Sequence, residues 1–132
     1  MAGVAMYGRG FTGVSETKAG AAKAGAYPGG EGAQGYREIA GRILDAKGQG
    51  RAGYQSVWDP VTQSWSLFNP TQKLWMGYDD PRAVLAKGRF VRDQGLAGVF
   101  AWELSQDNGD LLNAMNRGVG NVPLATQKEP RR

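Results

Sequence analysis

Carboxylates are the first candidates for acid–base chemistry in this sequence, which contains no histidine and no cysteine. Catalysis by a carboxylate pair requires two acids that flank one bond. The 12 acidic residues form no alternating set along one strand, and of the adjacent Asp79 and Asp80 the second is explained as a helix cap. The segment Gly8-Arg9-Gly10 is too short for a phosphate loop. We therefore assign no catalytic residue and expect no metal site and no cofactor.

Tryptophans are the second group of interest: Trp58, Trp65, Trp75 and Trp102. Aromatic rings stack on the apolar CH faces of sugars, so an exposed row of them would bind carbohydrate. The alternative is a tryptophan-rich core, which we favour for the first three. Trp102 differs from them, because it lies near the end of an apolar run and is followed by Glu103.

The apolar run at 98–104 is the strand that carries Trp102 and Glu103. Its apolar residues do not alternate with polar ones, which predicts a strand covered on both faces, as in a parallel sheet. A helix over 81–94 precedes it, because Asp80 can cap the first amides and a proline and a glycine suit its two ends. This helix and strand form half of a βαβ unit.

A second apolar strand is predicted over 3–9, with Tyr7 and Arg9 at its carboxyl end. Active sites of parallel barrels are built at that end of the strands. The alternative is that Tyr7 belongs to the core and Arg9 is a surface charge. After the run at 98–104 comes a polar loop, and then a helix that we expect Asp110 to cap. The order of strand, loop and helix is that of a barrel.

An α+β unit is predicted between these two strands. We expect a long loop over 14–35 and then an amphipathic helix over 36–47, stopped by Gly48. Three short strands follow, separated by Asp-Pro and Asn-Pro turns, at 54–58, 64–68 and 73–78. Their side chains suit an antiparallel meander that packs on one side.

Length and charge limit the classes of function. The 132 residues suffice for one ordinary domain but not for a complete (β/α)₈ barrel, which needs roughly 250. Of the net charge of +4, the last six residues supply +2, from three positive side chains and one negative. We therefore expect no nucleic-acid partner. No apolar run is long enough to span a membrane, so we expect no membrane partner, and no signal peptide is visible after Met1.

Three motifs occur in a fixed order along the chain. They are Met6-Tyr7-Gly8-Arg9-Gly10-Phe11, then Asp79-Asp80-Pro81-Arg82-Ala83-Val84-Leu85-Ala86-Lys87, then Gly98-Val99-Phe100-Ala101-Trp102-Glu103 with Asp107-Asn108-Gly109-Asp110-Leu111-Leu112. Together they resemble the C-terminal part of a bacterial chitinase of glycoside hydrolase family 18. The resemblance covers about residues 3–117.

The resemblance implies the C-terminal portion of a TIM barrel, an α/β fold, with an inserted α+β subdomain that forms one wall of a deep substrate cleft. The segments at 3–9 and 98–104 would be barrel strands seven and eight, and those at 81–94 and 110–117 helices seven and eight. The expected divisions are strand seven at 1–11, the insertion at 12–79, the last barrel elements at 80–117 and a disordered basic tail at 118–132.

The resemblance also implies roles for four residues. Trp102 would form the floor under the sugar at the cleavage point, Tyr7 and Arg9 would line the same region, and Glu103 would support it. Family members cut β-1,4 bonds of chitin with retention, using the substrate's N-acetyl oxygen and an acid from an Asp-x-x-Asp-x-Asp-x-Glu motif. The present sequence has no such motif. We expect this chain alone not to hydrolyse chitin.

Three hypotheses remain open. The chain is a portion of a chitinase that pairs with the N-terminal barrel half, or with itself, through open strand edges. Alternatively, it is a free-standing chitin-binding or scaffold module without catalysis. A basic nucleic-acid binder is the third and weakest hypothesis. Under the first two, the partner is chitin or a chitooligosaccharide, and the family resemblance implies secretion.

Overall fold

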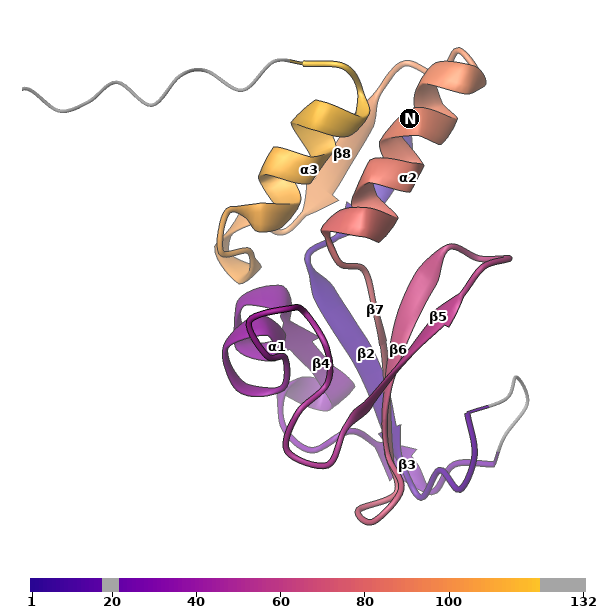
Figure 1. The fold of residues 1–132 in the computed structure, drawn as a ribbon, viewed down its shortest axis with the longest axis vertical. Helices are drawn as coiled ribbons and strands as arrows, with labels where there is room; N and C mark the ends of the chain where they lie inside the picture. The colour runs from indigo at the N-terminus through magenta and orange to yellow at the C-terminus, as the bar shows by residue number, and fades with distance from the viewer. Residues whose placement is uncertain (18–21, 122–132) are drawn as a thin grey trace, which may run out of the picture.

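Two sheets organise the chain in a computed structural model that describes residues 1–17 and 22–121 (Figure 1). Within these residues, a two-stranded parallel sheet lies at one end and a six-stranded antiparallel sheet at the other. The elements are β1 (Ala2–Ala5), β2 (Tyr7–Thr12), β3 (Gly25–Ala26), η1 (Gly30–Gly32), β4 (Ala33–Gly35), α1 (Tyr36–Arg42), β5 (Gln55–Asp59), β6 (Ser64–Asn69), β7 (Leu74–Tyr78), α2 (Pro81–Asp93), β8 (Val99–Trp102), η2 (Leu104–Gln106) and α3 (Asp110–Gly118). Of the predicted basic tail, the part from residue 122 lies outside the described residues.

The parallel sheet pairs β1 with β8, in a register that places Ala5 opposite Trp102. Helices α2 and α3 lie side by side against this sheet (Figure 1). Their backbones approach closely at two glycines, because a Cβ atom on Gly88 would lie 2.5 Å from the Cα atom of Gly118. This part of the chain is a small α/β unit, as the sequence predicted.

The single strand predicted over 3–9 is two strands in two different sheets. Strand β1 ends at Ala5 and β2 begins at Tyr7. Between them, the amide of Met6 donates to the carbonyl of Trp102 at 2.9 Å, and the Met6 carbonyl accepts from the amide of Tyr36 at 2.9 Å. The prediction of one strand was wrong because the apolar run continues while the pairing partner of the backbone changes at Met6.

The antiparallel sheet has the order β3-β2-β7-β6-β5, and β4 also pairs with β2. The predicted meander is confirmed as β5, β6 and β7, with each end within one residue of its expected position. The loop predicted over 14–35 is only partly irregular, because β3, η1 and β4 lie within it. These strands pair with β2 through backbone groups, which leave no pattern in a sequence rich in glycine and alanine.

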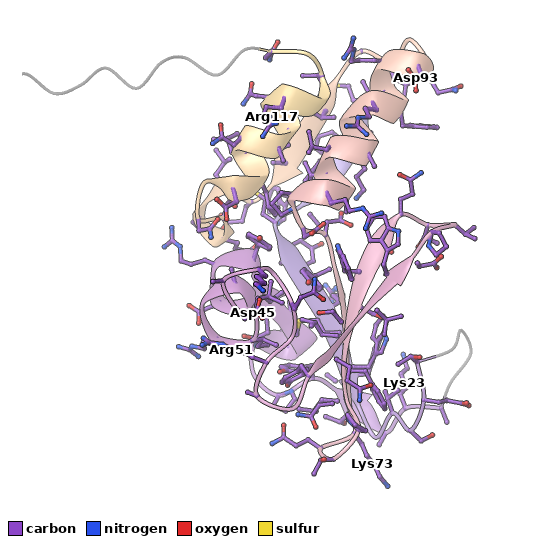
Figure 2. All side chains as sticks on the ribbon, in the orientation of Figure 1. Lys23, Asp45, Arg51, Lys73, Asp93 and Arg117 are labelled. Carbon is purple, nitrogen blue, oxygen red and sulfur yellow. The ribbon has the colours of Figure 1, made fainter. Side chains whose placement is uncertain are left out.

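Helix α1 begins at the predicted residue but ends earlier than predicted, at Arg42 rather than near Gly48. The reason is a turn that the Asp45 side chain stabilises, accepting hydrogen bonds from the amides of Lys47 at 2.8 Å and Gln49 at 2.9 Å. Such Asx interactions compete with helical hydrogen bonding. Asp45 lies in the loop beyond α1, where Figure 2 labels it.

The helix caps were predicted correctly in one case and wrongly in the other. The Asp80 carboxylate accepts from the amide of Ala83 at 2.9 Å and caps α2, as expected. For α3, the capping carboxylate is that of Asp107, which accepts from the amides of Leu111 at 3.2 Å and Leu112 at 2.9 Å. Asp110 is instead the first residue of α3, because the chain turns at the preceding glycine, whose φ is 103°.

One hydrophobic core joins the two sheets. Its members come from β1, from the antiparallel sheet and from all three α-helices, so the parallel and antiparallel sheets pack as one body. The buried members are Val4, Met6, Tyr36, Ile39, Leu44, Leu67, Met76, Tyr78, Val84, Leu111, Ala114 and Met115.

Strand β8 is not covered on both faces, contrary to the prediction from its continuous apolar run. Val99 and Ala101 are half-buried and pack against the core. On the other face, the side chain of Phe100 is 51% exposed and that of Trp102 is 70% exposed. The sequence prediction was wrong for this chain because the second face has no covering layer within the described residues.

Candidate functional site

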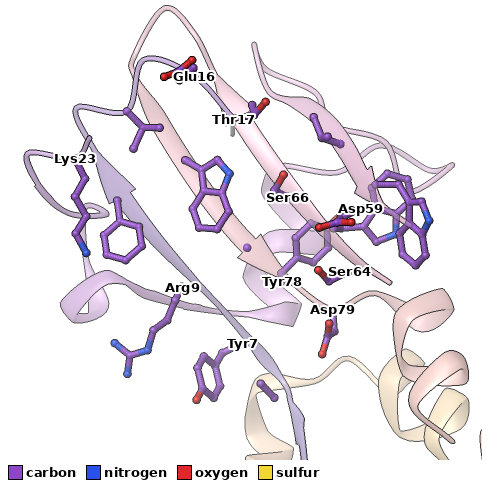
Figure 3. A pocket seen from close by; sticks show the side chains of 18 of the residues that line it. Tyr7, Arg9, Glu16, Thr17, Lys23, Asp59, Ser64, Ser66, Tyr78 and Asp79 are labelled. Carbon is purple, nitrogen blue, oxygen red and sulfur yellow. The ribbon is translucent and has the colours of Figure 1, made fainter. Parts of the chain in front are cut away.

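A cleft of about 980 Å³ lies over one face of the antiparallel sheet (Figure 3). Alternate side chains of four strands point into it, from β2, β7, β6 and β5. The opposite face of the sheet carries core residues, among them Leu67 and Met76, which are fully buried. The main lining residues are Tyr7, Arg9, Phe11, Val57, Asp59, Ser64, Ser66, Trp75, Gly77 and Asp79.

Tyr7 and Arg9 both line this cleft, two residues apart on β2 and on the same face of the strand. Figure 3 shows the two side chains next to each other along the strand. Tyr7 is half-buried and Arg9 is exposed. An exposed guanidinium beside a phenol offers several hydrogen-bond donors to a polar ligand. The structure therefore brings together two of the four site residues expected from the sequence.

Trp102 and Glu103 lie beyond one end of the cleft, not among its lining residues. Trp102 is opposite Ala5 in the parallel sheet, and Ala5 does line the cleft. Because register partners in neighbouring strands point to the same face, the exposed Trp102 ring continues the cleft surface beyond Ala5. The carboxylate of Glu103 accepts a hydrogen bond from the hydroxyl of Ser105, which fixes its direction in the loop after β8.

The remaining three tryptophans do not form one compact core. Trp58 and Trp65 contact each other, with ring centroids 5.1 Å apart, and Trp65 packs against the hydrophobic core. The guanidinium of Arg82 lies over the Trp58 ring at 4.0 Å. Trp75 lies on the other face of the sheet, where its ring is near Phe11, at 6.2 Å. All three rings border the cleft, but only Trp65 also packs against the hydrophobic core, so the core interpretation holds for Trp65 and not for Trp58 or Trp75.

The cleft carboxylates are held by structural partners. Asp59 accepts from the amides of Val61 at 2.8 Å and Thr62 at 3.3 Å, and these bonds keep the pKa of Asp59 below its usual value. Asp79 forms an ion pair with Lys87 of α2. Within the part of the chain that the structure describes, no cluster of three or more acidic, histidine or cysteine side chains could hold a metal ion. Asp59 and Asp79 are thus both engaged by partners within the chain.

Two buried groups near the cleft have perturbed ionisation. Burial, followed by the charge of Asp80, raises the pKa of Tyr78 above its usual value. The Tyr78 hydroxyl has no hydrogen-bond partner among residues 1–17 and 22–121. Burial also raises the pKa of Asp80, although the bond from the Ala83 amide opposes this effect. Tyr78 is the last residue of β7, and Asp80 caps the helix α2 that follows it.

Sequence reasoning missed several residues of the cleft face, including Phe11, Ser66 and Gly77. A signal for them existed in the alternation along β2 and β7, since Phe11 is two residues from Arg9, and Gly77 is two residues from Asp79. The signal could not be read without knowing that these strands are neighbours.

In the described part of the chain, no helix is long and apolar enough to cross a membrane.

Comparison with protein families gives a match over residues 1–107 to the family described as Glycosyl hydrolases family 18. The sequence is 35% identical over 139 residues to Chitinase A of Pseudoalteromonas piscicida, covering 92% of this chain and 17% of the relative. It is 40% identical over 124 residues to a probable endochitinase of Orgyia pseudotsugata multicapsid polyhedrosis virus, covering 89% of this chain and 21% of the relative. The chain thus spans about a fifth of the length of these curated relatives.

Solved structures give the same result. A chitinase of the Yersinia entomophaga toxin complex matches with a TM-score of 0.81 and 32% identity, over 89% of this chain and 25% of that one. A chitinase from Cycas revoluta, solved in complex with (GlcNAc)3, matches with a TM-score of 0.75 and 28% identity, over 89% of this chain and 32% of that one. Both relatives are several times longer than the matched part.

Proposed function

The chain belongs to the glycosyl hydrolases of family 18, and we propose that it forms part of a chitin-binding cleft in a chitinase-like hydrolase. In this proposal, the ligand is an oligomer of β-1,4-linked N-acetylglucosamine. The parent reaction is hydrolysis with retention, assisted by the substrate's own N-acetyl group. The acid that this reaction needs is absent from the sequence, so the chain binds and orients the sugar but does not cut it.

The observation that carries this proposal is the continuity of one surface from the cleft to Trp102. Tyr7 and Arg9 line the cleft, Ala5 continues it, and the exposed Trp102 ring lies opposite Ala5. Flat aromatic rings and nearby hydrogen-bond donors are the two features that recognise a pyranose, which has apolar CH faces and polar edges. The complexes of relatives with (GlcNAc)3 support the same class of ligand.

The exposed face of β8 supports the proposal that this chain is a portion of a barrel. Strands β1 and β8 are parallel and the helices α2 and α3 lie against them, as the last two strands and helices of a TIM barrel would require. The uncovered side chains of Phe100 and Trp102 would then face the barrel interior and the substrate. In this assignment β1 is strand seven and β8 is strand eight, and the elements from β2 to β7 form the inserted subdomain.

The sheet memberships favour a boundary of the inserted subdomain near Met6, because β2 pairs with β7 and not with β8. The division at residues 11 and 12 expected from the sequence would cut through β2. In the revised proposal, β2 therefore belongs to the cleft wall. Tyr7 and Arg9 then reach the sugar from the inserted subdomain, while Trp102 reaches it from the barrel.

A free-standing chitin-binding module is the second candidate. It is favoured by the extent of the cleft, about 980 Å³, which spans four strands of the antiparallel sheet. The two candidates agree on the ligand and on the residues that bind it. They differ in whether a further polypeptide completes a catalytic site.

Retention on chitin beads tests the shared part of both candidates. The wild-type chain should be retained, and Trp102→Ala should reduce retention roughly three- to tenfold, because a stacked ring contributes about 0.5–1.5 kcal/mol beyond its buried area. Leu112→Ala is the matched control, since Leu112 is exposed on α3, away from the cleft. Equal retention of wild type, Trp102→Ala and Leu112→Ala would contradict the assigned role of Trp102.

A further inference from the structure

The Trp75 ring lies across the backbone of β7 because residue 77 has no side chain. A Cβ atom on Gly77 would be 2.9 Å from Cη2 of Trp75, closer than real Cβ contacts allow. The six-membered part of the indole thus occupies the space above Gly77. Both residues line the cleft, so the indole forms part of its floor. A side chain at position 77 would force the ring into another position.

Polar groups stand on both sides of this floor. In the antiparallel sheet, Gly77 is opposite Arg9 of β2 and opposite Ser66 of β6. Arg9 and Ser66 both line the cleft, and Figure 3 shows them on opposite sides of it, on the two strands that flank β7. The guanidinium offers donors only, and the hydroxyl can both donate and accept. An aromatic floor with such edges matches a sugar ring lying flat.

Phe11 extends the aromatic surface on the side of β2. Its ring centroid is 6.2 Å from that of Trp75, with the two ring planes only 18° apart. The Lys23 ammonium lies over the Phe11 ring, 3.8 Å from its centroid. Lys23 therefore interacts with Phe11, whereas the half-buried Trp75 lines the cleft from β7, between β2 and β6.

We propose that Trp75 and Gly77 form a sugar-stacking subsite, flanked by Arg9 and Ser66, which binds one N-acetylglucosamine ring of a chitin oligomer. The identity of the sugar rests on the proposed function. Trp75 is opposite Phe11 in the sheet. Phe11 is four residues from Tyr7 on β2, so roughly 13 Å of strand separates Phe11 from Tyr7. Trp102 lies beyond the Tyr7 end, so the two tryptophans hold different rings of one oligomer.

The indole N–H signals of the ¹⁵N-labelled full chain provide the test, because each of the four tryptophans gives its own signal. A titration with N-acetylglucosamine oligomers should shift the Trp75 signal with saturation. The same shift should appear in Trp102→Ala, which lacks the aromatic contact of the proposed function. The Trp75→Ala substitution should weaken binding about three- to tenfold, as loss of one stacked ring predicts.

Gly77→Val is the second variant, because it keeps the Trp75 indole and changes only the space that the ring occupies above residue 77. Its added side chain should displace the Trp75 ring and weaken binding to the same extent as Trp75→Ala. The backbone amide spectrum reports whether this variant remains folded. Wild-type affinity in a folded Gly77→Val chain would overturn the role of Gly77 in building the subsite.

The outcomes separate this inference from the proposed function. A shift of the Trp102 signal without a shift of the Trp75 signal overturns the subsite and leaves the proposed function standing. A shift of Trp75 without one of Trp102 supports the subsite and contradicts the proposed role of Trp102. If no indole signal moves at saturating oligomer concentration, both proposals are wrong.

Discussion

At the scale of single residues, two glycines decide which face of β2 becomes the cleft. A Cβ atom on Gly8 would lie 2.8 Å from the sulfur of Met76, and one on Gly10 would lie 2.5 Å from the carbonyl oxygen of Trp75. These two positions therefore have no room for a side chain on the core side of the strand. The alternate residues Tyr7, Arg9 and Phe11 consequently project into the cleft.

Substituting Gly10 tests this packing directly. We expect Gly10→Ala to lower the free energy of unfolding by about 1–3 kcal/mol, because the methyl group meets rigid backbone. Gly41→Ala is the matched control: it adds the same methyl group in α1, where nothing lies within 4 Å. That control should raise the free energy of unfolding by about 0.5–1 kcal/mol.

Urea denaturation of both variants measures these changes. Opposite signs for the same chemical change would support the described packing of β2 against β7. A Gly10→Ala chain as stable as wild type would show that the strands are farther apart than described.

At the scale of elements, the Asp80 cap stabilises α2 through a hydrogen bond but places a charged carboxylate in a partly buried position. The Asp80 carboxylate bonds to the amide of Ala83, which stabilises the first turn, but burial raises its pKa, so its charge is unfavourable in the folded chain. Asn is as good a helix cap as Asp and carries no charge. Asp80→Asn should therefore be at least as stable as wild type at pH 7, whereas Asp80→Ala should lose about 1 kcal/mol.

The pH dependence of this difference has a defined sign. Because the folded pKa of Asp80 is raised, the cost of its charge is fully present above that pKa and disappears below the ordinary value of 3.8. Thermal unfolding of wild type and Asp80→Asn between pH 7 and pH 3 should show the advantage of Asn shrinking as the pH falls. An advantage that grows on acidification would contradict the burial of Asp80.

A hydrogen-bonded link also joins α1 to the segment before α3. The Arg37 side chain donates to the carbonyl of Asp107 through Nε at 3.2 Å and Nη2 at 3.0 Å. The carboxylate of Asp107 bonds to the first amides of α3. Arg37 thereby links α1, which directly follows β4 of the antiparallel sheet, to the loop that follows Trp102. The loop conformation, and with it the direction of Glu103, depends on contacts between both sheets.

Local sequence signals were sufficient to predict some of these elements but not others. Local signals predicted α2 with its Asp80 cap and the three strands of the meander, because capping and alternation act within a few residues. The cap of α3 was assigned to Asp110 rather than Asp107, since the turn at Gly109 decides which carboxylate faces the helix. The break at Met6 was missed because it depends on hydrogen bonds to Tyr36 and Trp102, residues far away in the chain.

At the scale of the whole molecule, the two sheets share one core, but one face of β8 stays open. The core joins β1 to the antiparallel sheet through residues such as Val4 and Met76. The opposite face presents Phe100, 51% exposed, and Trp102, 70% exposed. The apolar run of β8 predicted burial on both faces, but only the face of Val99 and Ala101 packs against the core. The sequence motifs alone identified the family. The cleft floor at Trp75 and Gly77 could be located only from the pairing of β2, β7 and β6.

Reconstitution of hydrolysis tests whether this chain completes a family 18 chitinase. The chain is mixed with a polypeptide that carries the first six strands of a family 18 barrel and its Asp-x-x-Asp-x-Asp-x-Glu motif, and release of N-acetylglucosamine oligomers from chitin is measured. We expect each part alone to be inactive, the mixture to hydrolyse chitin, and Trp102→Ala to lower its rate. Hydrolysis by the 132-residue chain alone, or a well-folded mixture without activity, would contradict the account.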